Sequence, residues 1–153
     1  TLTFDVLNAY DDWPELITNI SNYLHGRIRT LVLDNDTGFY YSGRFAVDTS
    51  KTDEATTTVV ITGTVDPYKY DAELTEIALA VAGSAAILLY GSRMPVVPII
   101  TASVVMTVTF DGTVYNLAVG ANTIPGVCLT EGENILLFTG TGNITISYRR
   151  GTF

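Results

Sequence analysis

The clearest local pattern is a helical segment at residues 12–26, which read DWPELITNISNYLHG. Its apolar side chains recur at intervals of three and four, which places them on one face of a helix. Asp12 and Glu15 have the spacing of a capping box, and Gly26 suits the left-handed residue that ends a helix. The segment therefore predicts one α-helix at about residues 12–25, with its apolar face against a sheet.

The sequence on both sides of this helix is typical of β-strands, because Thr, Val, Tyr and Ile are frequent and Lys is scarce. Residues 1–10 alternate between polar and apolar side chains. The stretch from Arg27 to Val65 reads as a three-stranded antiparallel meander, with an expected bulge at Gly43. We expect the meander to end at Pro67, since proline cannot donate to a strand ladder.

The second half of the chain has a different pattern. An apolar run and two prolines between residues 77 and 98 indicate a crossover. An Asp-Gly pair predicts a hairpin between residues 101–110 and 113–119. A Gly-Thr-Gly triplet at 140–142 predicts a second, closing hairpin. Short strands with turn signals about every ten residues are typical of a small β-sandwich.

These patterns predict a mainly β fold of antiparallel sheets with one α-helix. The expected organisation is a β-domain with the helix at residues 1–76, a crossover at 77–98 and a small C-terminal β-sandwich at 99–153. The longest apolar run, from Ile77 to Tyr90, is shorter than the roughly 20 residues that span a bilayer.

Charge and composition restrict the function of this 153-residue chain. Sixteen acidic residues against eight basic ones give a net charge of −8, which argues against a nucleic-acid or anionic-membrane partner. One Cys and one His rule out a cysteine cluster for zinc and any site that needs two imidazoles. We therefore expect no enzyme, no cofactor and no metal site, and assign no residue to such roles.

Three features that could carry chemistry have simpler interpretations. The Asp-Asn-Asp run at 34–36 departs from the calcium-loop pattern, so a hairpin turn is favoured. His25 lies at the predicted helix end, where a positive imidazole would complement the helix dipole rather than serve a catalytic triad. Cys128 lies between Val127 and Leu129 and reads as a small buried hydrophobe in a strand.

Three segments carry a family resemblance: residues 13–27, beginning WPEL, residues 31–44, ending GFYYSGR, and residues 65–70, VDPYKY. Their order and spacing resemble those of phage distal tail proteins. These proteins form the tail hub of long-tailed phages and prophages of Gram-positive bacteria. The run from 94 to 151 is similar to the end of short members.

The resemblance implies a ring-forming β-domain portion followed by a galectin-like β-sandwich, and a non-catalytic structural role in the tail tip. A hub ring, hexameric in the full-length protein, would link the tail tube to the baseplate and host-recognition apparatus. The implied partners are copies of the chain itself, the tail tube and a tail-associated baseplate protein. The implied location is the host cytoplasm before assembly and the virion tail afterwards. Members carry strands and a Gly-rich loop before the equivalent of Thr1, so we expect this chain to lack its N-terminal part.

Six residues of the matching segments are candidates for structural or interface roles: Trp13, Tyr40, Tyr41, Asp66, Pro67 and Tyr68. Trp13 lies on the apolar helix face and is expected in the core. Tyr40 and Tyr41 point to opposite faces of one strand, so we expect one in the core and the other free for an interface.

A carbohydrate-binding β-sandwich that recognises host cell-wall glycan is the alternative function. It needs an exposed aromatic patch in the last third of the chain, where Phe110, Tyr115 and Tyr148 are the available members. Strand alternation places these three equally well in the core, which we favour. A hydrolase has no supporting constellation of residues.

Overall fold

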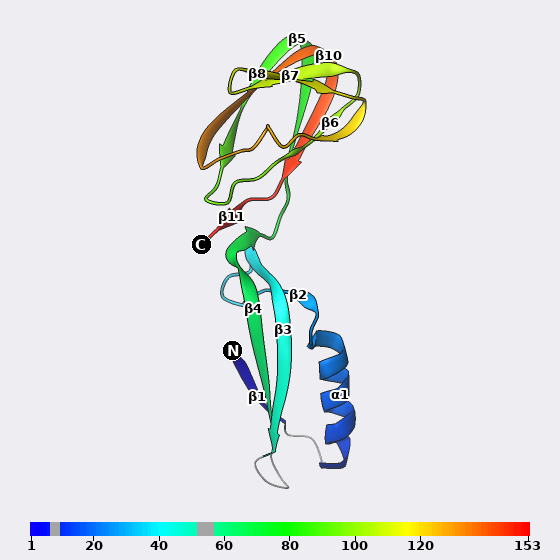
Figure 1. Cartoon of the computed structure of the whole chain (residues 1–153), viewed down its shortest axis with the longest axis vertical. Helices are drawn as coiled ribbons and strands as arrows, with labels where there is room; N and C mark the ends of the chain where they lie inside the picture. The colour runs from blue at the N-terminus through cyan, green and yellow to red at the C-terminus, as the bar shows by residue number, and fades with distance from the viewer. Residues whose placement is uncertain (7–9, 52–56) are drawn as a thin grey trace. The chain divides into compact units, whose positions relative to one another are not determined.

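The helix predicted from the sequence is present in the computed structural model as α1 (Trp13–Leu24), directly after a short 3-10 turn, η1 (Tyr10–Asp12). The structure describes residues 1–6, 10–51 and 57–153 (Figure 1). The first strand, β1, spans Leu2–Val6, and the remainder of the strand predicted at 1–10 includes residues 7–9, which lie outside the described part. The fold is mainly antiparallel β, as predicted.

The two ends of α1 compare differently with the sequence prediction. Gly26 has φ +71°, the left-handed conformation that the pattern predicts after the helix. The predicted capping box is wrong, because Asp12 has helical dihedral angles and its side chain makes no capping hydrogen bond. The 3-10 turn already coils the chain before α1, so Asp12 lacks the extended backbone that an N-cap needs.

Residues 1–67 form one unit, built on an antiparallel sheet with strand order β1-β4-β3-β2. The strands are β2 (Ile28–Leu31), β3 (Phe39–Lys51) and β4 (Thr57–Asp71), which confirms the predicted meander. Helix α1 packs on this sheet through a small core of Val6, Trp13 and Val59, with Leu16, Ile17 and Ile20 around it. Trp13 is therefore a core residue, as predicted.

The meander differs from its predicted form at Gly43 and at Pro67. The register between β2 and β3 runs without interruption through Gly43, which pairs with Arg29, so this pair of strands has no bulge there. Gly43 instead permits close approach, since a Cβ there would lie 2.5 Å from Val65 Cα. Strand β4 also continues through Pro67 to Asp71. It can do so because Pro67 lies between the stretches of β4 that pair with β1 and with β11 (Gly151–Thr152).

Residues 68–153 form the second unit, a curled six-stranded sheet. Its strands are β5 (Thr75–Gly91), β6 (Ile99–Ala102), β7 (Met106–Phe110), β8 (Thr113–Leu117), β9 (Gly120–Thr123) and β10 (Gly132–Tyr148). Strand β5 occupies most of the range in which the composition indicates a crossover. Its alternate side chains, including the buried Val81 and Leu89, enter the core of this unit.

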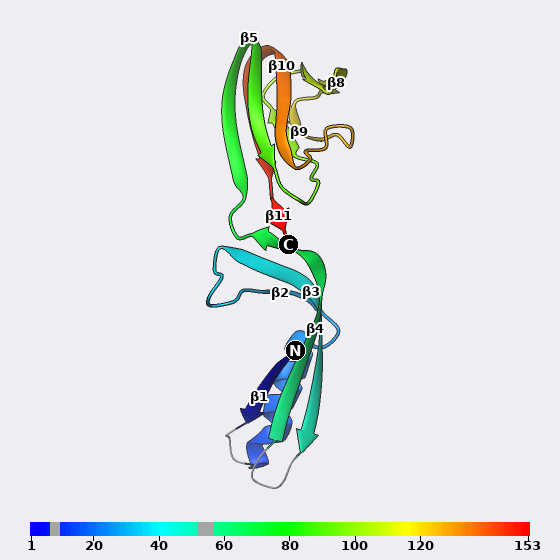
Figure 2. The ribbon, with the colours of Figure 1, turned by 90° about the vertical axis from the view of Figure 1, so that its left-hand side faces the viewer.

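Strand β10 is one continuous strand, so the closing hairpin predicted at 140–142 is wrong. Residues 132–148 pair with residues 91–75 of β5 without a break. Gly140, with φ +149°, faces Gly83, with φ +88°, at the middle of this ribbon. There the two strands bend over together, as Figures 1 and 2 show at the tip of the unit. The glycine triplet thus makes a corner in a paired strand.

The corner gives the second unit two layers. On the side of β10 away from β5, residues 137–139 pair with β7, and residues 144–147 pair with β6. Strand β8 extends the layer of β7, and β9 extends the layer of β6. Leu136 and Phe138 before the corner and Ile144 and Ile146 after it are buried in one core. The alternation of buried and exposed side chains therefore continues through the bend, and the buried side chains fill the space between the layers.

The Asp-Gly hairpin is confirmed between β7 and β8, where Asp111 and Gly112 have φ values of +46° and +74°. Positive φ at both central residues matches the turn that Asp-Gly favours. The predicted strand at 101–110 is divided in two, since β6 ends at Ala102 and β7 starts at Met106.

Two loops of the second unit share a Gly-x-Asn motif that the sequence analysis did not identify. Asn122 accepts a bond from Ala118 N at 2.9 Å and donates to Ala118 O and Gly120 O, both at 2.8 Å. Asn134 repeats this pattern with Thr130 and Gly132. Both glycines have φ +96°. Each asparagine thus satisfies the backbone of a tight loop before a strand.

We expect Trp13→Ala to lower the free energy of unfolding of the first unit by about 3–5 kcal/mol. The Trp13 side chain is only 4% exposed and contacts both the helix and the sheet core. Urea unfolding followed by circular dichroism would measure the loss. Tyr23→Ala is the matched control on the same helix, because Tyr23 is 64% exposed and contacts Arg29, a contact worth about 1 kcal/mol. Equal losses in the two variants would contradict the assignment of Trp13 to the core.

We expect Gly140→Ala to destabilise the second unit by about 1–3 kcal/mol. A Cβ at Gly140 would lie 2.7 Å from Met106 Cβ, and its φ of +149° disfavours other residues. The neighbouring Thr141→Ala is the control, with an expected loss below about 1 kcal/mol. Thermal unfolding measures both variants. If alanine is tolerated at 140 as well as at 141, the corner does not depend on glycine.

Candidate functional site

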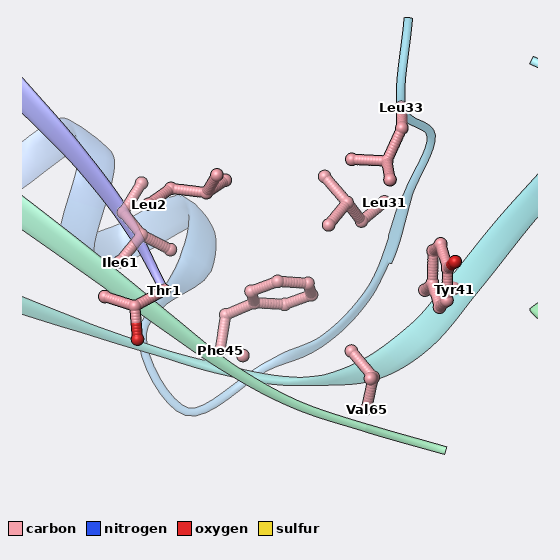
Figure 3. A pocket seen from close by; sticks show the side chains of 9 residues that line it. Thr1, Leu2, Leu31, Leu33, Tyr41, Phe45, Ile61 and Val65 are labelled. Atoms are coloured by element: carbon pink, nitrogen blue, oxygen red, sulfur yellow. The ribbon is translucent and has the colours of Figure 1, made fainter. Parts of the chain in front are cut away.

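An apolar groove lies on the sheet of the first unit, and Figure 3 shows its lining side chains. Its volume is about 240 Å³. Both edge strands and both central strands contribute to it, through Thr1, Leu2, Leu31, Leu33, Tyr41, Phe45, Ile61, Gly63 and Val65. The groove is thus a surface of the sheet on which the strands meet, rather than a loop feature.

Strand alternation builds the floor of the groove. Tyr41 and Phe45 are on one face of β3, and Ile61, Gly63 and Val65 are on one face of β4. Gly63 leaves room for the neighbouring ring, because a Cβ there would lie 2.8 Å from Phe45 Cε1. The core around Trp13 also includes Val59 and Ile61, so the groove continues from this core along β4.

The chemistry of the groove is that of a contact surface. None of its lining side chains is a carboxylate, imidazole, thiol, amine or guanidinium, and its only aromatic hydroxyl is that of Tyr41. Such a lining offers apolar area and the hydroxyls of Thr1 and Tyr41, which suits packing against an apolar partner and gives no general acid or base at neutral pH. The sequence analysis missed Leu31, Leu33 and Phe45 because sequence patterning does not show where a helix leaves a sheet uncovered.

His25 lies at the C-terminal end of α1, where it is the C-cap residue. Its Nδ1 lies 3.1 Å from Val47 N and 3.2 Å from Val47 O. His25 thus ties the end of the helix to β3, where it also forms a parallel bridge with Phe45. The positive charge expected on its imidazole stays a prediction.

Arginines supply the positive charge at this helix end. Arg27 Nε donates to Asn22 O at 3.0 Å, and Arg29 Nε donates to Tyr23 O at 3.1 Å. Arg44 Nη1 donates to Gly26 O. The guanidinium groups satisfy carbonyls that the helix leaves without an internal partner and complement the negative end of its dipole.

The remaining predicted interface residues lie on β3 and β4. Tyr40 and Tyr41 are both half-buried, so burial does not separate a core tyrosine from an interface tyrosine, and Tyr41 lines the groove. Asp66 and Pro67 are exposed on β4. Tyr68 stacks on Phe153 with ring centroids 4.9 Å apart, within the second unit.

The aromatic residues that a glycan platform would need are not available as a patch. Phe110 and Tyr148 are buried in the core of the second unit, and Tyr115 packs against it. The favoured core interpretation of these three residues is therefore confirmed. Burial raises the pKa of the Tyr148 hydroxyl above its usual value, an effect that the positive charge of Arg150 opposes.

The other chemical candidates have structural positions. Residues 34–36 form turns between β2 and β3, with Asp36 N bonded to Leu33 O at 2.9 Å, as the hairpin interpretation predicts. Cys128 is half-buried and lies outside the strands, which corrects the prediction of a buried strand residue. Across residues 1–6, 10–51 and 57–153, no three His, Cys, Asp or Glu side chains come together as a metal-binding group. Within the same ranges, no helix has the length and apolarity to cross a membrane.

These observations define the class of the protein as a mainly antiparallel β fold with one helix and curled sheets. The crystal structure of the SPP1 Dit protein (gp 19.1) has a similar fold, with a TM-score of 0.58 and 14% sequence identity. The match covers 96% of this chain and 77% of that chain. The SPP1 Dit protein is a paradigm of the hub adsorption apparatus in phages that infect Gram-positive bacteria. No family model and no curated protein matches this chain.

We expect the stability of the second unit to fall as pH rises above about 10, because the folded state holds the Tyr148 proton more tightly than the unfolded chain. This contribution is fully present below the ordinary tyrosine value of 10.0 and is lost as pH rises through the higher folded pKa. Urea midpoints at about pH 9 and about pH 11 would measure it.

The variant Tyr148→Phe has no hydroxyl to titrate, so it should lose less stability over this interval than the wild type. Tyr23→Phe, at an exposed position of the other unit, should keep the wild-type pH dependence. An identical loss in wild type and Tyr148→Phe would contradict the role of Tyr148 burial.

Proposed function

We propose that this chain is a non-catalytic structural component of a phage or prophage tail tip. In this role it forms a hub ring that links the tail tube to the baseplate and host-recognition apparatus. The observation that carries the proposal is the similarity of fold to the SPP1 hub protein over 96% of the chain. The order of the segments at 13–27, 31–44 and 65–70 supports the same assignment.

The surface chemistry of the first unit is consistent with assembly rather than turnover. Its groove is apolar and is built by the strands themselves. Burial of such an apolar surface against a protein partner removes it from water and lowers the free energy. We therefore propose that copies of the chain associate, as a hexamer in the full-length protein, and that Tyr41 lies at or near the contact.

The remaining partners follow from the same role. The proposed neighbours in the assembled tail are the tail-tube protein and a tail-associated baseplate protein. The chain would be present in the host cytoplasm before assembly and in the virion tail afterwards. Its net charge of −8 disfavours tight binding to DNA, which carries the same sign of charge.

We expect light scattering and electron microscopy of the full-length protein to show rings with a mass near six times that of its subunit. Gold-labelled antibodies against the chain should mark the tail tip of particles of the phage that encodes it. Label on the capsid, or particles with complete tails after deletion of the gene, would overturn the assignment.

Tyr41→Ala should shift the assembly equilibrium towards smaller species. Tyr23→Ala is the matched control, because it removes an exposed tyrosine of the same unit outside the groove. A mass that falls equally in the two variants would show that the groove is not part of the contact.

A further inference from the structure

Within residues 1–6, 10–51 and 57–153, strand β5 has one side without a paired strand. It pairs with β10 along its full length, from Thr75 opposite Tyr148 to Gly91 opposite Gly132. Among the strands that the structure describes, β10 is the one that pairs with β5. Figure 2 shows both halves of β5 along one side of the unit. The outer side of β5 therefore presents a row of backbone N–H and C=O groups to solvent.

The sequence of β5 lacks the features that usually protect an edge strand. Its residues, TEIALAVAGSAAILLYG, include Glu76 as the one charged residue and contain no lysine and no proline. Soluble proteins place charges, prolines or short strands at such edges to prevent pairing with another chain. In a chain with sixteen acidic residues, a 17-residue strand with a single charge is unusual.

The core of the second unit also reaches solvent along this edge. The inward-facing side chains Ile77, Leu79, Ala85 and Ile87 pack against the core but are only partly buried. These residues lie on both sides of the corner at Gly83, so partly exposed apolar side chains follow both halves of β5. A strand added to this edge would cover apolar area and satisfy backbone groups together.

The outer face next to the edge is apolar as well. Leu88 and Tyr90 are 41% and 55% exposed, and Ile135 and Leu137 on the neighbouring strand are 61% and 40% exposed. Leu88 is directly opposite Ile135. This cluster extends the apolar surface from the edge of β5 onto β10, with the exposed Glu133 opposite Tyr90 at its border.

We propose that β5 pairs antiparallel with β5 of a second copy of this chain around a two-fold axis. An isologous contact of this kind needs a surface that complements itself, and an antiparallel strand edge does so through its backbone. Two chains that each carry a net charge of −8 repel each other over most of their surface. They approach with least repulsion along β5, where Glu76 is the single charge.

The size of the contact is sufficient for a specific interface. A strand of 17 residues at about 3.3 Å per residue, beside layers about 10 Å thick, buries on the order of 500 Å² on each copy. The total of on the order of 1,000 Å² is at the lower limit for biological interfaces. This contact lies in the second unit and does not depend on the assignment of the chain to a tail hub.

The variant Ala80→Lys/Leu88→Lys tests the contact, because it places one exposed charge on each half of β5. We expect light scattering of the whole chain to show half the wild-type mass for this variant, whatever other assembly the protein forms. The matched control is Asn143→Lys/Thr139→Lys, which puts exposed lysines on β10 directly opposite Ala80 and Ser84, one strand further from the edge and outside the apolar cluster. The control should keep the wild-type mass.

Amide hydrogen exchange supplies an independent measurement on the wild-type chain. Every second amide of β5 points away from β10, and we expect these amides to gain protection as the protein concentration increases. Fast exchange at these amides up to about 1 mM protein, the weak end of specific association, would overturn the proposal. An equal mass for the β5 variant and the wild type would overturn it as well. If the wild type forms rings that both lysine variants leave intact, the β5 contact fails while the tail-hub assignment stands.

Discussion

The pairing of β10 with β5 over 17 residues is the interaction on which the second unit depends. This ribbon supplies strands to both layers, so one continuous ladder determines the register of each layer. The bend requires two glycines, because Gly83 and Gly140 both have positive φ and Met106 packs directly against Gly140. Because the ribbon bends, β7 and β6 pair with separate stretches of β10, and the core lies between the two resulting layers.

The first unit depends on a different constraint, the limited length of its helix. Helix α1 has 12 residues and covers only part of the apolar sheet face. The covered part contains Trp13 and Val59 in a closed core, and the uncovered part is the groove around Phe45 and Tyr41. His25 and the arginines fix the helix end to the strands. The groove is therefore a fixed consequence of where the helix ends.

Local patterns in the sequence predicted the elements that local chemistry determines. The stripe of apolar residues predicted α1, and Asp111-Gly112 predicted the hairpin between β7 and β8, because each depends on residues close in the chain. The triplet at Gly140 was misread because glycines permit either a hairpin or a corner in a paired strand. The partner strand, β5, decides between the two, and it lies more than 50 residues earlier in the chain. The capping role of Asp12 failed for a similar reason, since η1 changed its surroundings.

The candidate site was less predictable than the fold. Sequence resemblance pointed to Tyr41. The leucines of the groove could be assigned only from the sheet topology, which brings the edge strands β1 and β2 beside the central strands β4 and β3. The same holds for β5, whose apolar run reads as a crossover until its pairing shows one open side. Both surfaces consist of strand backbone and apolar side chains, with almost no titratable groups. Surfaces of this composition suit burial against another protein surface and backbone pairing, and neither of these proposed modes of association requires a catalytic residue.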